Sequence, residues 1–161
     1  MKEIKEVYEK YREVALEAQT RSENSHNYEY ARKLRECHIF TGNETLEELI
    51  QVIFSPRGAE FLTTYNFPDI SLFRKFKKYH PEQYGVYIDC GEIALSDEKN
   101  VYLIGNTIGE IKCAQTQGNR IILMCGAKAN ITASGYSVVK VETDDFSKAD
   151  VKVKDHAKVL R

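Results

Sequence analysis

The stretch VYLIGNTIGEIKCAQTQGNRIILMCGAKANITASGYSVVKVETDDFSKADVKV, residues 101–153, decides the fold of this chain. An apolar residue recurs in it at every tenth position, and the residue two positions later is mostly small or apolar. The first set is Val101, Ile111, Ile121, Ile131, Val141 and Val151, and the second is Leu103, Cys113, Leu123, Ala133, Thr143 and Val153. Because side chains at i and i+2 share one face of a strand, each unit is predicted to be a short strand with an inward-facing pair.

Turn-forming residues separate these pairs, and one unit cannot bury its pair alone, so neighbouring units must stack. Two topologies satisfy this requirement: a short β-solenoid with two strands in each coil of about twenty residues, or an antiparallel meander. We favour the solenoid, because hairpins usually alternate tight and loose connections, whereas the ten-residue spacing here is constant. Mostly small residues two positions before each pair, such as Gly109 and Ala129, would let stacked coils approach closely.

The N-terminal half of the chain has the spacing of amphipathic helices. Helices are predicted over about residues 2–20 and 28–37, and from Thr45, Pro56 and Ile70 onward. Thr45 with Glu48 is a capping-box sequence, and Ser55 before Pro56 is typical of an N-cap. His80-Pro81 is predicted to end the helical half.

The predicted fold class is therefore α+β, with a helical region at residues 1–82 and a β-repeat domain at residues 83–161. The helical region could cap the first end of a solenoid. The other end, around Val151 to Leu160, has no obvious cap, although it carries several lysines that discourage uncontrolled edge pairing. We predict that self-association closes an end or a flank, which makes the protein a homo-oligomer.

Composition excludes several classes of function. The net charge of the 161 residues is −1, so affinity for nucleic acid or an anionic membrane would need a local basic patch. No apolar stretch approaches the length of a membrane span, and the charged N-terminus lacks the apolar core of a signal peptide. The chain is therefore expected to be cytoplasmic.

Enzymatic motifs are absent from the sequence. There is no phosphate-binding loop, dinucleotide fingerprint, hydrolase nucleophile elbow or zinc-protease motif. The four cysteines contain no C-x-x-C pair, and Cys113 at an inward repeat position is expected to act as a small apolar residue. Cys90 lies between Asp89 and Glu92, which would raise its pKa and disfavour nucleophilic catalysis. We predict no catalytic residue, no metal and no cofactor.

The strongest local patch is the basic aromatic segment from Phe73 to His80. It indicates either an anion site or an amphipathic helix whose cations face solvent. The predicted ligand-binding residues are Arg57, Arg74, Lys75, Lys77 and Lys78, with Tyr79 or Tyr84 stacking on the ligand. A nucleotide phosphate, a nucleic acid and an acidic protein are all compatible with this chemistry.

Several motifs between about residues 50 and 160 carry a resemblance. They are Phe67-Pro68-Asp69, Phe73-Arg74-x-Phe76-Lys77, Tyr84-Gly85-Val86-Tyr87-Ile88-Asp89, Gly105-Asn106-Thr107, Met124-Cys125-Gly126-Ala127-Lys128-Ala129 and Ala133-Ser134-Gly135-Tyr136. As a set they resemble small uncharacterised proteins of phages and conjugative elements of gut Bacteroides-type bacteria. The resemblance implies a mobile-element context in the cytoplasm of a bacterial host, and it supplies no catalytic residues.

The sequence thus favours a non-enzymatic, homo-oligomeric binding protein of a phage or mobile element. The expected role is to counter host defence, either by sequestering an anionic signalling nucleotide or by occupying a host immune protein. One alternative is a virion-associated structural or assembly protein. Another is a nucleic-acid-binding protein that uses the basic segment.

Overall fold

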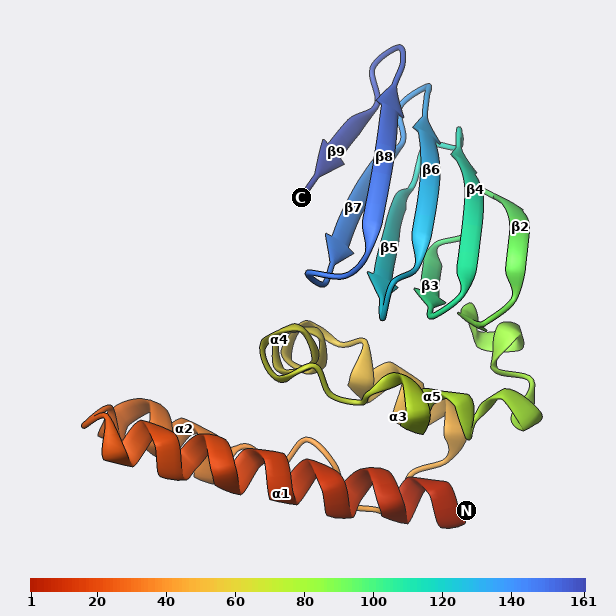
Figure 1. Cartoon of the computed structure of the whole chain (residues 1–161). Helices are drawn as coiled ribbons and strands as arrows, with labels where there is room; N and C mark the ends of the chain where they lie inside the picture. The colour runs from red at the N-terminus through yellow and green to blue at the C-terminus, as the bar shows by residue number, and fades with distance from the viewer. The chain divides into compact units, whose positions relative to one another are not determined.

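The computed structural model describes all residues, 1–161, and divides them into two compact units at residues 1–68 and 69–161 (Figure 1). The predicted boundary at residues 82 and 83 followed the change from helix to strand. Compactness instead groups the short helical segments of residues 69–84 with the strands that follow them. No helix of either unit is long and apolar enough to span a membrane.

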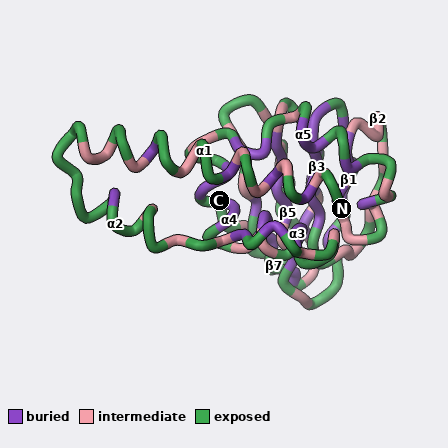
Figure 2. Tube along the Cα trace, turned by 90° about the horizontal axis from the view of Figure 1, so that it is seen from below, coloured by how far each residue is buried: buried purple, intermediate pink, exposed green.

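The first unit consists of four helices, as the apolar spacing predicts. They are α1 (Lys2–Asn24), α2 (Tyr28–Glu36), α3 (Leu46–Ile53) and α4 (Pro56–Tyr65). Helix α1 buries one residue at every turn or every second turn, and α2 packs along it. In Figure 2 these buried residues are spaced along a tube that is mostly exposed. The buried residues of α1 are Ile4, Val7, Tyr11 and Ala18.

Helix starts in the first unit follow the predicted capping residues. The Thr45 hydroxyl accepts the Glu48 N–H at 3.2 Å, and the Glu48 carboxylate accepts the Thr45 N–H at 2.8 Å, which completes the capping box of α3. The Ser55 hydroxyl accepts the Gly58 N–H at 3.1 Å at the start of α4. These bonds satisfy N–H groups that a helix terminus otherwise leaves without partners.

Aromatic rings form the centre of the first unit. The Tyr11 ring lies 5.0 Å from the ring centroids of both Phe40 and Phe61, and its hydroxyl donates to the Cys37 carbonyl at 2.7 Å. Burial therefore raises the pKa of Tyr11 to about 12. This buried ring and its bond tie α1 to the segment after α2.

The second unit opens with three short helical segments: α5 (Ile70–Arg74) and the 3₁₀ turns η1 (Lys77–Tyr79) and η2 (Pro81–Tyr84). The prediction that His80-Pro81 ends the helical half is wrong, because η2 follows it. His80 adopts a left-handed conformation with φ 52°, and Pro81 occupies the first position of the next turn. Proline suits that position, since its missing N–H and fixed φ cost nothing there.

Nine strands follow and form two parallel sheets, which confirms the solenoid and excludes the meander. They are β1 (Val86–Ile88), β2 (Gly91–Ser96), β3 (Asn100–Ile104), β4 (Thr107–Cys113), β5 (Gly118–Met124), β6 (Lys128–Ala133), β7 (Val138–Thr143), β8 (Lys148–Val153) and β9 (Lys158–Leu160). One sheet has five strands in the order β1-β3-β5-β7-β9, and the other has four in the order β2-β4-β6-β8. Consecutive strands thus alternate between the sheets, as in a two-sided coil (Figure 1).

The strand registers give the length of each coil. From β3 onward every residue pairs with the residue 20 positions later, as Val101 with Ile121 and Ile121 with Val141. The first coil is shorter, because Leu95 pairs with Ile111, only 16 positions later. The ten-residue repeat is therefore half of a twenty-residue coil, and it begins after the first coil.

Inward side chains of the repeat make the core between the two sheets. Val101, Ile111, Ile121, Ile131 and Val141 are 4% exposed or less. Cys113 is also fully buried, as expected of a small apolar residue, and burial raises its pKa to about 11. The core opens toward the C-terminus, where the exposed inward positions are Thr143 and Val153.

The outward face of the five-stranded sheet is buried in its first strands, which the repeat did not predict. Tyr102, Ile104, Ile122 and Met124 point away from the core between the sheets and are at most 8% exposed. Part of the cover comes from α5, since a Cβ on Gly105 would lie 2.7 Å from the Ile70 side chain. Strands β3 and β5 are therefore buried on both faces.

Candidate functional site

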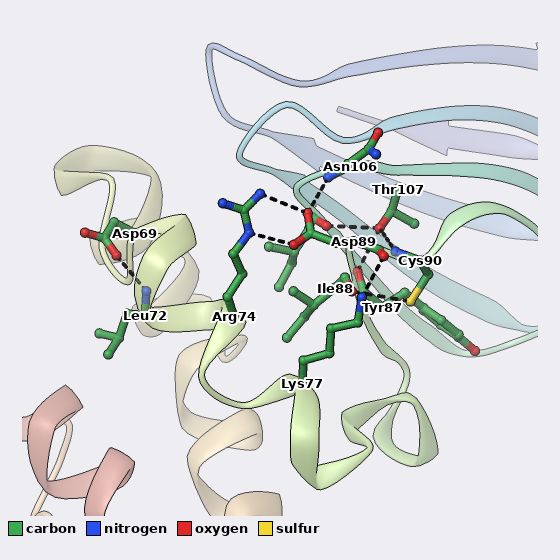
Figure 3. Close-up of polar contacts among 11 residues, drawn as sticks. Asp69, Leu72, Arg74, Lys77, Tyr87, Ile88, Asp89, Cys90, Asn106 and Thr107 are labelled. Atoms are coloured by element: carbon green, nitrogen blue, oxygen red, sulfur yellow. Dashed lines mark hydrogen bonds and ion pairs between the residues drawn. The ribbon is translucent and has the colours of Figure 1, made fainter.

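Two of the predicted anion-binding residues, Arg74 and Lys77, bind the turn between β1 and β2 instead of facing solvent freely (Figure 3). The Arg74 guanidinium donates to both carboxylate oxygens of Asp89, from Nε at 2.7 Å and from a terminal nitrogen at 3.3 Å. The Lys77 ammonium donates to the Asp89 carbonyl at 2.9 Å. These contacts join the helical entry of the second unit to the first turn of its solenoid.

Asp89 is the centre of this clamp. It has a left-handed conformation with φ 47°, and its carboxylate also accepts the Asn106 N–H of the next coil at 2.8 Å. The hydrogen bond from Arg74, together with that from Asn106 and the charge of Arg74, holds the pKa of Asp89 below its ordinary value. The clamp therefore uses charges that the sequence had assigned to a ligand.

The same device recurs at other turns of the solenoid. The Asp97 carboxylate accepts the Ala114 N–H at 2.7 Å, that of Asp144 accepts the Cys125 N–H at 2.6 Å, and that of Asp155 accepts the Gly135 N–H at 3.0 Å. In each case an acidic turn residue satisfies a backbone donor of a neighbouring coil. Asp89 thus belongs to a structural series that holds the coils together.

Replacing Asp89 by Asn should remove the acid sensitivity that this clamp gives the second unit. Asp89 has a lowered pKa in the folded chain, so its contribution is complete above the ordinary value of 3.8 and is lost as the pH falls through the folded value. At neutral pH we expect Asp89→Asn to lower the free energy of unfolding by about 1 kcal/mol, since Arg74 is partly exposed. Urea denaturation at several pH values measures the difference.

The difference between the native chain and Asp89→Asn should shrink toward zero in acid. Asp145→Asn is the matched control, because Asp145 is an exposed turn carboxylate with no hydrogen bond to another residue. A difference that persists unchanged at the lowest pH would show that the clamp does not depend on the ionised carboxylate.

The other predicted residues of the basic segment lie nearby but form no enclosed site. Lys75 and Lys78 are exposed, and the Lys78 ammonium lies 4.9 Å from the centroid of the Tyr79 ring. Tyr79 and Tyr84 are half-buried. This arrangement brings Arg74, Lys77 and Asp89 together, while the remaining members stay on an open surface.

The thiols beside the solenoid turns are protonated at neutral pH. Burial raises the pKa of Cys90, and the neighbouring Glu82 raises it further. Burial also raises the pKa of Cys125 to about 12. The expected effect of acidic neighbours on Cys90 has the right sign, although burial is its main cause and Glu82 is the stronger acid contact. No group of three or more His, Cys, Asp or Glu residues is placed to hold a metal ion.

Arg57 lies apart from the basic segment in sequence and lines a cavity of the first unit. The cavity has a volume of about 460 Å³. Helix α4 lines one side of it, and α2 and the segment after α2 line the other. Its apolar lining includes Leu34, Ile39 and Phe61, and its charged lining includes Lys33, Glu36 and Glu60. This volume is within the range of small-molecule sites in proteins.

Two tyrosines stand at this cavity with their hydroxyl groups joined. The Tyr30 and Tyr65 hydroxyls are 2.8 Å apart, and burial together with this bond raises the pKa of Tyr65. The Tyr65 group therefore remains a neutral hydroxyl that can donate or accept a hydrogen bond. The Arg57 guanidinium, in contrast, makes no hydrogen bond or ion pair with another residue.

A second hollow of about 520 Å³ lies between α1 and the region of α2, but its cations are engaged. Arg12 lies over the Tyr8 ring at 5.7 Å, and Arg35 pairs with Glu23 at 2.9 Å. At the first cavity, Lys33 likewise pairs with Glu29 at 3.1 Å. Arg57 is therefore the cation at either cavity that is most available to a ligand.

Comparison with known proteins adds no assignment: no family model, curated protein or solved structure matches the chain. Its function is therefore inferred from the arrangement of its own side chains. Arg57 was predicted from its position after Pro56, whereas Tyr30 and Tyr65 were not. Their 35-residue separation gives no local signal, because only the packing of α2 near α4 brings their hydroxyls together.

Proposed function

We propose that this protein is a non-enzymatic binding protein whose ligand is a small anionic molecule of the nucleotide class, held in the cavity at Arg57. The observation that carries the proposal is an unpaired guanidinium in the lining of a cavity of about 460 Å³ that also presents aromatic rings and hydroxyl groups. Arginine suits a phosphate because its planar fork makes paired hydrogen bonds. Tyr30, Phe61 and Tyr65 offer ring faces and edges to a base.

Sequestration fits this arrangement better than turnover. The lining brings together two cations, two carboxylates, hydroxyls and apolar rings. The raised pKa of Tyr65 keeps its hydroxyl protonated, so it is a poor general base. Carriage by a phage or mobile element, and use of the bound nucleotide to blunt a host defence signal, remain part of the proposal on the strength of the resemblance alone.

Reversing the charge at Arg57 should abolish ligand binding. We expect Arg57→Glu to weaken the affinity for the nucleotide at least about tenfold, because it replaces the phosphate donor with a like charge. Native mass spectrometry of the protein purified from cells identifies any retained ligand. Calorimetric titration with mono-, di- and cyclic nucleotides then gives the affinity of each variant.

Arg32→Glu is the matched control, since Arg32 is an exposed arginine of α2 that lines neither cavity. It should bind like the native chain. Reversal of both Lys75 and Lys78 tests the basic segment without touching the Asp89 clamp. Loss of binding in that double variant, with Arg57→Glu unaffected, would place the ligand on the basic segment and overturn the cavity assignment.

An assembly role is the second candidate, and the open end of the solenoid favours it. The last coil exposes inward positions that are buried in every middle coil, as at Val153, which is 52% exposed. A structural component would use this end as its contact surface. Recovery of the protein in purified virus particles tests that role, and its absence from them would contradict it.

A further inference from the structure

The C-terminal end of the solenoid is stepped, because its two sheets have unequal numbers of strands. The five-stranded sheet ends at β9, and the four-stranded sheet ends one strand earlier at β8 (Figure 1). Residues of β8, of β9 and of the turn before β9 pack against the core but stay half-exposed, namely Ala149, Val151, Ala157 and Val159. The step is therefore lined with the apolar row that continues the core.

The free edges of these strands carry ordered backbone groups. On β8 the N–H groups of Lys148 and Lys154 donate to Ala127 and Ala133, so even-numbered residues point toward β6. On β9 the Lys158 N–H donates to Ser137 in the same way. Because alternate residues of a parallel strand point to opposite sides, the odd-numbered N–H and C=O groups of β8 and β9 face the open edge. Such edges are templates for pairing with another strand.

We propose that a second copy of this chain covers the step through a two-fold axis parallel to the strands, so that β8 pairs with β9 of the partner and β9 pairs with β8 of the partner. The strands β8 and β9 run in opposite directions (Figure 1), so both new pairs are antiparallel. Each joined sheet then contains the five strands of one copy and the four strands of the other.

Only this symmetry closes both edges at once. A two-fold axis perpendicular to the sheets would pair β9 with itself and leave the two shorter β8 edges separated by a gap. The axis parallel to the strands places the longer sheet of each copy on the shorter sheet of its partner. It also keeps the inward rows facing the same way, so the two cores become continuous. The contact is isologous and leaves no edge for further growth.

The first coil is a poor alternative partner for the last coil. Its register is 16 residues, whereas the last coils repeat every 20, so the turns of the two ends do not match. Val86 and Ile88 on β1 are also at most 2% exposed. A head-to-tail stack would therefore meet a covered strand and a shorter coil.

Charge limits the contact to one closed pair. The outward positions of β8 are Lys148, Asp150 and Lys152, and β9 carries Lys158. Excess lysine repels edges that approach at random. Asp150 pairs with Lys148 at 3.3 Å within one copy, and it also gives the β9 lysine of the partner an opposite charge across the antiparallel pair. This pattern favours a specific dimer over a growing stack.

Sedimentation equilibrium and amide hydrogen exchange of the full chain test the proposal together. We expect a dimer with twice the 18.5 kDa mass of one chain, and we expect this dimer to dissociate on dilution. Exchange at the odd-numbered amides of β8 and β9 should slow at least about tenfold as the dimer forms. The even-numbered amides of β8 should be protected at every concentration, which makes them an internal control.

Val153→Lys should abolish the dimer, because it places a charge in the joined core. The single copy should tolerate the change, because Val153 is already 52% exposed there. Ile108→Lys is the control, because Ile108 is also an exposed apolar residue, at 37%, but lies on β4, two strands away from the edge strand β8. A monomer at submillimolar concentration, a dimer that survives Val153→Lys, or exchange at odd-numbered amides that ignores concentration would each overturn the proposal. None of these outcomes depends on Arg57 or its ligand.

Discussion

Ile121→Ala should lower the free energy of unfolding of the second unit by about 2–5 kcal/mol. Ile121 is fully buried on β5 and pairs in register with Val101 on one side and Val141 on the other. Removing its outer carbons opens a cavity in the middle of three stacked coils, where close packing on both sides limits relaxation. Urea denaturation followed by circular dichroism measures the loss.

Ile108→Ala separates this packing effect from the general cost of replacing isoleucine in a strand. Ile108 lies on β4 but points outward and is 37% exposed. Its truncation should cost at most about 1 kcal/mol, which is the span of strand propensities. Equal losses for the two variants would mean that the inward row is not the main source of stability.

Gly58→Ala should destabilise the first unit by about 3 kcal/mol, although alanine normally strengthens a helix. A Cβ at Gly58 would lie 2.1 Å from the Val52 carbonyl oxygen and 2.3 Å from that of Ile53. Both atoms belong to the backbone at the end of α3, so no side chain can rotate away. The substitution must push α4 away from α3. Thermal unfolding followed by the helical signal in circular dichroism measures the loss of stability.

Gly118→Ala is the control for this second effect. No atom lies within 4 Å of a Cβ at Gly118, and its backbone is not in the left-handed region. The chain should tolerate this change with a stability close to native. An equally small effect of Gly58→Ala would contradict the prediction. It would mean that α3 and α4 can move apart at little cost in stability.

The repeat in residues 101–153 predicts the solenoid well, because burial between two sheets imposes the same demand on every coil. Ile111 and Ile131 occupy equivalent places on β4 and β6, so the chain repeats the residue type. The β-repeat domain was predicted to begin at residue 83, but the length of the first coil was not predicted, since its 16-residue register is out of phase with the others. A period is visible only where successive coils have equal length.

A missed signal concerns the outward face of β3 and β5. The runs Val101–Ile104 and Ile121–Met124 are apolar without interruption, which is typical of strands covered on both faces. The ten-residue repeat accounts for the inward residues of these runs, but it does not account for the apolar outward residues. The structure buries all of them.

Side-chain partners far apart in sequence limited prediction of the candidate site. Arg74 and Lys77 form a basic patch when only neighbouring residues are considered. The fold sets Asp89 beside them, so their charges hold a turn. Conversely, Arg57 was predicted to join the anion site of the basic segment, whereas folding places it in the lining of a cavity of the first unit.

Every coil from β3 onward has twenty residues, and one such circuit of the chain is here called a lap. This uniform length also restricts how the chain length can change over evolution. Insertion or deletion of one whole lap would keep every inward residue inward and every acidic turn residue beside its backbone N–H donor, so it adds or removes a module. A change of half a lap would exchange the two sheets and reverse the strand direction for all later residues. Natural variants of this half of the molecule should therefore differ in length by multiples of a full lap.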